Sequence, residues 1–330
     1  MKHKDRLEMI QSAKRILNSE RCVYAGYGSC DGSVIAAHTV SKCLGLKEMA
    51  EKGQVYACDL KPHHKPQKRD FVKTGINQVS TFHFACSKHD NDLFKLIESG
   101  KLEINEDTVQ LFFLRSMAQE IYEGENQQHF IKLLPMMQNE RTIMGVAAKE
   151  SDNRHYFERA KTEDLTLKYC CLNYADPLPF LATTAHSPFL SISGEQLFES
   201  SNIEAVAPVI VINAFNYKGQ GRILFSWPEE CSSACDTFMQ DLLVLSPVTD
   251  VILSFLFVET QNLILKVSFY EQLPAGVIEC LLDVKHYNID PRHPYVKTIP
   301  LVRFELKNFV SITSNSASVN LLNVGSITLQ

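Results

Sequence analysis

The residues of this chain with the clearest capacity for chemistry are three cysteines and a histidine in its N-terminal half. Cys86 and His89 are separated by two residues in the segment 80–91, and Cys22 and Cys30 lie upstream. Thiolate and imidazole are ligands that Zn²⁺ prefers, and zinc sites gather them in close pairs because a short loop fixes two ligands at little entropic cost. We therefore predict a structural Zn²⁺ site formed by Cys22, Cys30, Cys86 and His89.

Other interpretations of the cysteines stay open. Cys22 and Cys30 are further apart than a usual zinc knuckle allows, although the glycines between them would let the loop curl back. Cys43 and Cys58 are rival ligands, and the apolar helical run around Cys43 favours a place for it in the core. Ten cysteines in a chain without a secretion signal are also compatible with reduced thiols that bind no metal.

The elements that would position these residues change in type near residue 165. Hydrophobic residues make up 45% of the 330 positions, which is enough for ordinary cores, and the length favours two domains. We predict an α+β protein with a zinc-binding module and helical segments over 1–165, followed by a β-rich domain of unknown role over 166–330. Apolar spacing predicts helices over 4–19, 91–100, from 105 onward, 125–137, 142–164 and 233–244. Apolar runs predict strands over 166–172, 189–192, 207–213, 222–227, 251–258 and 263–267.

Charge and hydropathy narrow the classes of partner. The net charge of −5 gives no general attraction to nucleic acid, so such a contact would need a local basic patch. The segment 61–73 is such a patch, and a solvated Pro/Lys-rich linker is its other interpretation. Its candidate phosphate contacts are Lys61, Lys65, Lys68, Arg69 and Lys73.

The sequence gives no sign of a membrane protein. The most apolar run, 251–258, is far shorter than the roughly 20 residues that a membrane helix needs. The N-terminus lacks the apolar segment of a signal peptide. We therefore expect no membrane contact and a cytoplasmic location.

The order of the metal-binding residues resembles the treble-clef form of HNH nucleases. In that family two knuckles bind a structural zinc, a histidine on the first hairpin strand activates water, and a residue at the head of the helix holds a catalytic divalent cation. The resemblance implies that His38 is the general base and that Asp90 holds Mg²⁺ or Mn²⁺. The chain departs from the family pattern in having Ala37 where an acidic residue is usual, and Ser80 and Thr81 near the usual place of an asparagine.

A closer resemblance is to a set of bacterial proteins of about this length with no established activity. The matching phrases in this chain are His38-Thr-Val-Ser-Lys42, Met49-Ala-Glu-Lys-Gly-Gln-Val-Tyr56 and the segment from Ser80 to Glu98. The resemblance implies a shared N-terminal metal module and no particular reaction. Bacterial proteins that join an HNH-like module to an unrelated domain often act against foreign DNA, which implies a defence role by analogy alone.

Two functions follow from these observations. The first is a zinc-stabilised, HNH-like module that acts on nucleic acid as a metal-dependent endonuclease. The second is a non-catalytic zinc module that binds nucleic acid or a protein partner, with the β-rich half as a second binding surface.

Overall fold

The protein is a mixed α and β structure, as the sequence predicts. Two predicted features lie outside the described residues: the helix over 4–19, and the loop that carries Lys61, Lys65, Lys68 and Arg69. The computed structural model describes residues 22–59, 70–133, 140–162, 164–199, 205–245, 247–260, 262–287, 304, 306 and 309–320.

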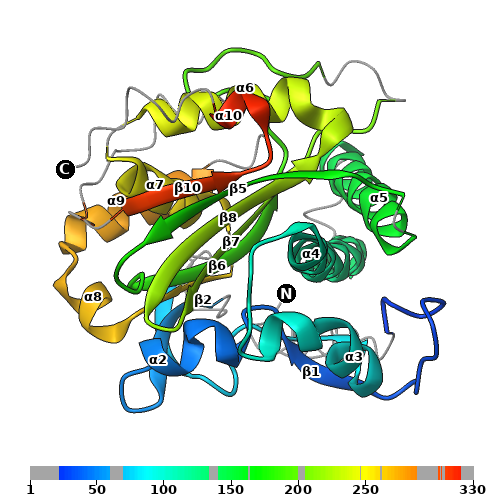
Figure 1. Cartoon of the computed structure of the whole chain (residues 1–330), viewed down its shortest axis with the longest axis horizontal. Helices are drawn as coiled ribbons and strands as arrows, with labels where there is room; N and C mark the ends of the chain where they lie inside the picture. Colours follow the sequence, from blue (N-terminus) through cyan, green and yellow to red (C-terminus); the bar gives the residue numbers. More distant parts are fainter. Residues whose placement is uncertain are drawn as a thin grey trace.

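An antiparallel sheet of eight strands, in the order β10-β5-β8-β7-β6-β9-β2-β3, is the centre of the fold (Figure 1). Every neighbouring pair in it is antiparallel. The β7–β8 hairpin turns at Lys218 and Gly219, both at positive φ, as a tight two-residue hairpin turn requires. The strands are β2 (Gln54–Asp59), β3 (Asp70–Gly75), β5 (Leu167–Tyr174), β6 (Phe180–His186), β7 (Ile210–Tyr217), β8 (Gln220–Pro228), β9 (Leu263–Leu265) and β10 (Phe309–Ser314).

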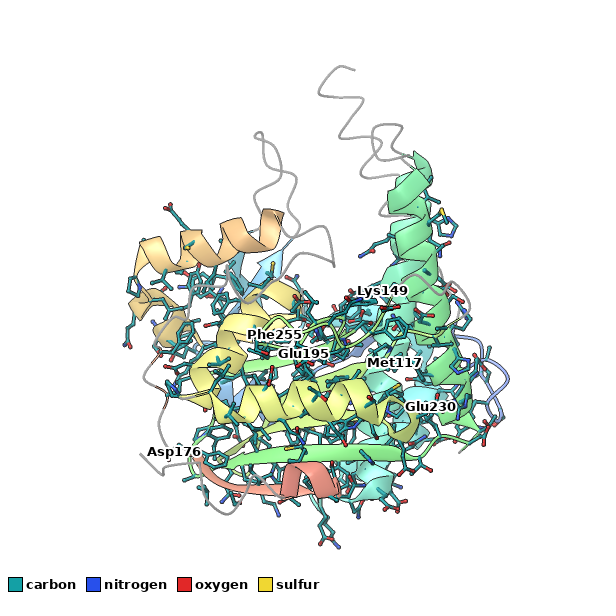
Figure 2. The ribbon with its side chains drawn as sticks, turned by 90° about the horizontal axis from the view of Figure 1, so that it is seen from above. Met117, Lys149, Asp176, Glu195, Glu230 and Phe255 are labelled. Atoms are coloured by element: carbon teal, nitrogen blue, oxygen red, sulfur yellow. The ribbon has the colours of Figure 1, made fainter. Side chains whose placement is uncertain are left out.

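Helices cover both faces of this sheet. Thr183 of β6 contacts Ser116 of α4 (Glu106–Leu133), whereas His186 of the same strand packs on Phe238 of α6 (Ser232–Val244) and Phe255 of α7 (Val248–Glu259). Residues three apart on a strand face opposite ways, so α4 lies on one face and α6 and α7 on the other. Figure 2 shows α6 and α7 across the strands.

Helix α4 pairs with α5 (Glu140–Lys161). Lys149 of α5, labelled in Figure 2, reaches Glu120 of α4 at 3.1 Å. The start of α4 follows from its sequence, because Asn105 and Thr108 each accept a hydrogen bond from the backbone N–H of the other at 3.0 Å. The helices of the second half are completed by η3 (Glu229–Cys231), α8 (Val267–Gln272), α9 (Ala275–Tyr287) and α10 (Ala317–Asn320).

A second, two-stranded sheet pairs β1 (Val34–His38) with β4 (Thr81–Cys86), and α3 (Ser87–Glu98) follows β4 directly. Between β1 and β4 the chain forms η1 (Lys42–Leu46), α2 (Lys47–Met49) and the edge strands β2 and β3 of the large sheet. Gly45 of η1, at φ +99°, lies directly on β7, where an added Cβ would be 2.6 Å from the Cβ of Asn216.

The boundary predicted near residue 165 falls between α5 and β5, where the helical segment ends. Strands from both sides of it nevertheless belong to one sheet, since β2 pairs with β9. A single cluster of buried residues likewise runs from Cys22 to Val319.

Two strand predictions were wrong. Residues 251–258 are inside helix α7, and 189–192 forms only an isolated bridge between Leu190 and Gln196. Four strands of the large sheet, β2, β3, β6 and β10, were not predicted. The run 251–258 is buried all round, so a helix there shows no amphipathic period to distinguish it from a buried strand. Among the helices that the structure describes, none combines the length and hydropathy needed to cross a membrane.

Candidate metal centre

The four predicted zinc ligands come from two segments that backbone pairing brings together. Val23 N–H donates to Phe84 O (2.8 Å) and Ser87 N–H donates to Ser33 O (3.3 Å), so both ends of the loop 22–33 are tied to β4 and α3. In the β1–β4 register, Val34 lies opposite Cys86. The loop that carries Cys22 and Cys30 therefore closes over the junction of β4 and α3.

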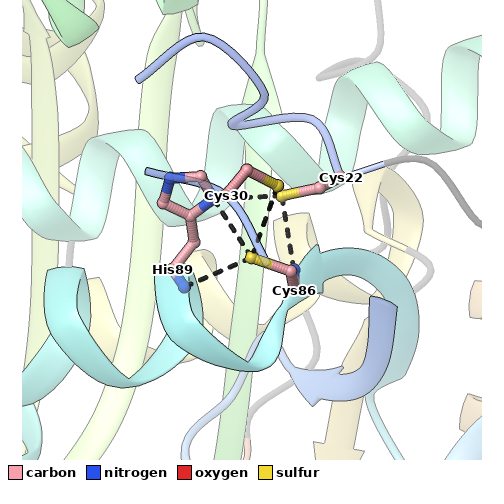
Figure 3. Close-up of side chains that lie close together, drawn as sticks. All are labelled: Cys22, Cys30, Cys86 and His89. Atoms are coloured by element: carbon pink, nitrogen blue, oxygen red, sulfur yellow. Dashed lines mark hydrogen bonds between the residues drawn. The ribbon is translucent and has the colours of Figure 1, made fainter. Parts of the chain in front are cut away.

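Cys86 and His89 occupy the start of α3. Cys86 is the N-cap residue, and its Sγ accepts a hydrogen bond from the His89 backbone N–H at 3.4 Å. A cap of this kind places a sulfur at the positive end of the helix dipole, where a thiolate is favoured. His89 lies one turn further along, so both side chains point to the same side of the helix start (Figure 3).

The ligand atoms of Cys22, Cys30, Cys86 and His89 all lie within 4.8 Å of one another (Figure 3). His89 Nδ1 is 3.2 Å from both the Cys22 and Cys86 sulfurs, and the Cys30 and Cys86 sulfurs are 3.7 Å apart. Tetrahedral zinc would place two sulfurs about 3.8 Å apart and a sulfur and a nitrogen about 3.6 Å apart. The group therefore has the composition and nearly the spacing of a Cys₃His metal site, and it could hold a metal ion.

The surroundings of His89 orient its ring for this task. Its Nε2–H donates to Tyr27 O at 2.5 Å, which leaves Nδ1 with the free lone pair that points at the sulfurs. Tyr24 packs against the ring with the centroids 5.8 Å apart. A carbonyl behind a histidine ligand fixes its tautomer and raises its basicity, as metal sites require.

Burial and hydrogen bonding shift the pKa values of two of the thiols in opposite directions. Burial raises the pKa of Cys22 to about 12, so this thiol keeps its proton unless a positive charge is close. Burial also acts to raise the pKa of Cys86, but the N–H groups of His89 and Asp31 outweigh it and the net pKa is lowered. A bound divalent cation would favour the thiolate form of both residues, and of Cys22 above all.

The rival cysteines are elsewhere. Cys43 lies in η1 and Cys58 on β2, and neither belongs to the four-residue group. Cys43 is exposed, so its predicted place in the core was wrong. Within the described part of the chain, this group alone has three or more His, Cys, Asp or Glu ligand atoms so close together.

Neither of the two residues that the HNH resemblance implies for catalysis belongs to the metal group: Asp90 adjoins His89, whereas His38 lies at the other end of β1, opposite Thr81. His38 ends β1, and its Nε2 is 3.3 Å from Ile76 O. Burial lowers the pKa of His38, so the ring is neutral at neutral pH. Asp90 follows His89 in α3, and the Arg115 guanidinium contacts it at 3.3 Å. Burial raises the pKa of Asp90 and the charge of Arg115 offsets this only in part.

Arg115 is a buried charged residue near the metal group that was not predicted from the sequence. Its side chain is 4% exposed, pairs with Glu98 (2.8 Å) as well as Asp90, and stacks on Phe94 with its central carbon 4.4 Å from the ring centroid. These three partners are all on α3. The signal in the sequence was an arginine within the inward apolar face of α4, between Phe112 and Met117, where a charge must have partners.

Of the predicted phosphate contacts, the structure describes Lys73. It lies on β3, where its Nζ is 2.8 Å from Glu271 and 5.4 Å from the centroid of the Tyr56 ring. Its charge is therefore already paired within the molecule.

Comparisons with known proteins add no relative. No protein-family model, curated protein or solved structure matches the chain. The case for a function therefore depends on the geometry of the metal group.

Proposed function

We propose that Cys22, Cys30, Cys86 and His89 bind a structural Zn²⁺, and that the ion holds a treble-clef-like module that binds nucleic acid. The observation that carries the proposal is the convergence of four soft or borderline ligands from two segments within 4.8 Å. Three of the four are buried, which suits an ion that stabilises structure.

The order of elements supports the treble-clef comparison. A loop with two ligands precedes β1, β1 pairs with β4, and the other two ligands come from the start of α3. The departure is the long segment 39–80 between the two strands, part of which joins the large sheet.

Elemental analysis of the purified protein tests the zinc proposal. We expect one zinc per chain in the wild type and in Cys43→Ser, which removes an exposed thiol outside the group. In Cys86→Ser we expect zinc below about a tenth of a molar equivalent, because this sulfur links Cys30 and His89. A wild type without zinc, or a variant that keeps it, would contradict the proposal.

Nucleic-acid binding draws its support from the resemblance and from the basic segment 61–73. Its test is a mobility-shift titration with DNA and RNA at several salt concentrations. Replacing Lys61, Lys65, Lys68 and Arg69 by Ser should weaken binding. It should also reduce the slope of log Kd against log salt concentration by the contribution of about four phosphate contacts. Lys73→Ser should change little, because Lys73 already pairs with Glu271. Equal affinity in the wild type, the fourfold variant and Lys73→Ser would show that the segment 61–73 does not bind nucleic acid.

A second candidate function is a metal-dependent endonuclease. It is favoured by a neutral His38 at the end of β1 and by a carboxylate, Asp90, in the first turn of α3. A neutral imidazole can take a proton from water while a divalent cation stabilises charge on phosphate. The Arg115–Asp90 pair is the feature that such a cation would have to displace.

Plasmid and RNA cleavage with Mg²⁺ or Mn²⁺ tests this candidate. His38→Ala and Asp90→Asn should each lower the cleavage rate by at least about 100-fold. His155→Ala, which changes a histidine on α5 that contacts Arg159, is the matched control. Cleavage that survives both changes would exclude His38 and Asp90 as the catalytic pair.

A further inference from the structure

One of the four ligands of the metal group differs from the others in its access to solvent. Cys22, Cys86 and His89 are 5%, 0% and 4% exposed, whereas Cys30 is an exposed residue. Figure 3 shows the Cys30 side chain next to those of the other three ligands. Of the four ligands, Cys30 is therefore the residue that solvent reaches most readily.

The backbone also supports the four ligands unequally. The Cys86 N–H donates to the Cys22 sulfur at 3.3 Å, and the His89 N–H donates to the Cys86 sulfur at 3.4 Å. In the described residues no backbone N–H donates to the Cys30 sulfur, whose neighbour is the Cys86 sulfur at 3.7 Å. Hydrogen bonds to a metal-bound sulfur reduce its reactivity, so Cys30 is the least protected thiolate.

The loop holds this exposed sulfur close to a buried one. Lys88 bonds to both neighbours of Cys30: its Nζ to Ser29 Oγ, and its backbone N–H to Asp31 Oδ2 (3.1 Å). A disulfide needs sulfurs about 2.05 Å apart, so Cys30 and Cys86 would have to approach by roughly 1.7 Å. Gly28 and Gly32, both at positive φ on either side of Cys30, allow a change of this size.

We propose that Cys30 is a peroxide-reactive modification site, and that its oxidation joins it to Cys86 and releases the metal. The inference rests on the structural-zinc proposal and adds a means of regulating the same site. Exposure, sulfur distance and backbone support all single out Cys30.

The chemistry balances with hydrogen peroxide as the two-electron oxidant. The Cys30 thiolate attacks one peroxide oxygen, the O–O bond breaks, hydroxide leaves and Cys30 becomes a sulfenic acid. The Cys86 thiolate then attacks the Cys30 sulfur, the S–O bond breaks and a second hydroxide leaves. The products are one disulfide and two hydroxides. Zinc loses two of its four ligands and dissociates.

The experiment starts from protein whose zinc content has been measured, in a Cys43→Ser, Cys280→Ser background that removes two other exposed thiols. Peroxide is added, released zinc is followed with a chromogenic chelator, and non-reduced peptides are mapped by mass spectrometry. We expect zinc release to track a Cys30–Cys86 disulfide in a one-to-one ratio. In Cys30→His, which keeps four ligands without the exposed thiol, release should be at least about tenfold slower.

Several outcomes would overturn the inference. One is zinc release at equal rates from the background protein and from Cys30→His, and another is a first disulfide that joins Cys22 to Cys86. Retention of zinc after Cys30 is oxidised would overturn it too. Protein that contains no zinc before peroxide is added would instead overturn the structural-zinc proposal, so the two failures are distinguished.

Discussion

The two sheets of this protein are stabilised by different means. All eight residues of β7 in the large sheet are buried, whereas in β1 of the small sheet only Ala37 is. A sheet of only two strands is marginal on its own in water. The small sheet depends on what packs against it. Phe84 and Ala85 of β4 are buried in the same core cluster as the large sheet, and Phe82 contacts Tyr122 of α4. Its end is closed by the loop 22–33, α3 and the metal group. The large sheet depends on apolar area removed from water.

The difference teaches where each kind of residue matters. In the large sheet, loss of side-chain volume should lower the free energy of unfolding without regard to metal. In the small sheet, loss of a ligand or of a support for α3 should act first on the metal and locally on the loop. Four predictions follow this division, from the largest expected effect to the smallest.

Removal of zinc should produce the largest effect, and it should be confined to the small sheet. With a strong zinc chelator, the amides of 22–33 and 86–89 should lose at least about 10⁴-fold in hydrogen-exchange protection, because we expect the ion to supply most of their cross-linking. The amides of β7 and β8 should keep their protection. Hydrogen exchange with mass spectrometry measures both sets at once. Equal loss in both sheets would mean that the division between them is false.

Truncation of a core ring in the large sheet should act in the opposite way. Phe225 of β8 is fully buried, so Phe225→Ala should lower the free energy of unfolding by about 3–5 kcal/mol and leave the zinc content unchanged. Val310 on β10 is 54% exposed, and Val310→Ala should change stability by less than about 0.5 kcal/mol. Urea unfolding and elemental analysis give the two readouts. Loss of zinc in Phe225→Ala would show that the sheets are not independent.

Arg115 links the two regions, so its replacement should affect both in moderation. Arg115→Met leaves Asp90 and Glu98 without their cation and should cost roughly 2–3 kcal/mol, since Glu98 is partly exposed. Zinc affinity should fall by roughly tenfold, because α3 carries His89. Lys95→Met, on the exposed side of α3, is the matched control. Adding Asp90→Asn to Arg115→Met should recover part of the loss, and a further loss instead would contradict the pairing.

The smallest effect concerns pH and His38. Burial lowers the pKa of His38 in the folded protein, so the unfolded chain takes up a proton at a higher pH than the folded one. The stability that this residue contributes is present above about pH 6.5 and is lost as the pH falls through its folded pKa. Urea unfolding of zinc-saturated protein at pH 7.5 and 5.5 measures it, and His38→Gln should show a weaker decline. An equal decline in both proteins would assign it to other groups.

The metal group was predictable because its chemistry is local in each half. Cys86 and His89 are close in sequence, and the glycines of the loop 22–33 indicate a tightly turning loop that can bring Cys22 and Cys30 together. That the Cys22–Cys30 loop meets the Cys86–His89 segment was predicted from the ligand preference of zinc. In the structure, the backbone hydrogen bonds of Val23 and Ser87 hold the two segments together. The capping residues of α4 were likewise visible, since Asn105 and Thr108 act within one turn.

What the sequence left open depends on distant parts of the chain. The partners of Arg115 are on another helix, and nothing near residue 115 names them. The helix at 251–258 is apolar on every side, so periodicity did not distinguish it from a strand. The pairing of β2 with β9 joins residues about 200 positions apart, and a break in composition near 165 gives no hint of it.

The chain forms β2 and β3 between β1 and β4, and this order has a consequence for protein engineering. The chain leaves the small sheet after β1, builds one border of the large sheet, and returns to complete the small one. A fragment that stops after α3 would keep the metal group but would lack β9, the partner of β2. Strand β2 would then be an unpaired edge that can bind other molecules. Excision of the N-terminal module would thus yield a self-associating piece unless β2 and β3 were trimmed away with their connections.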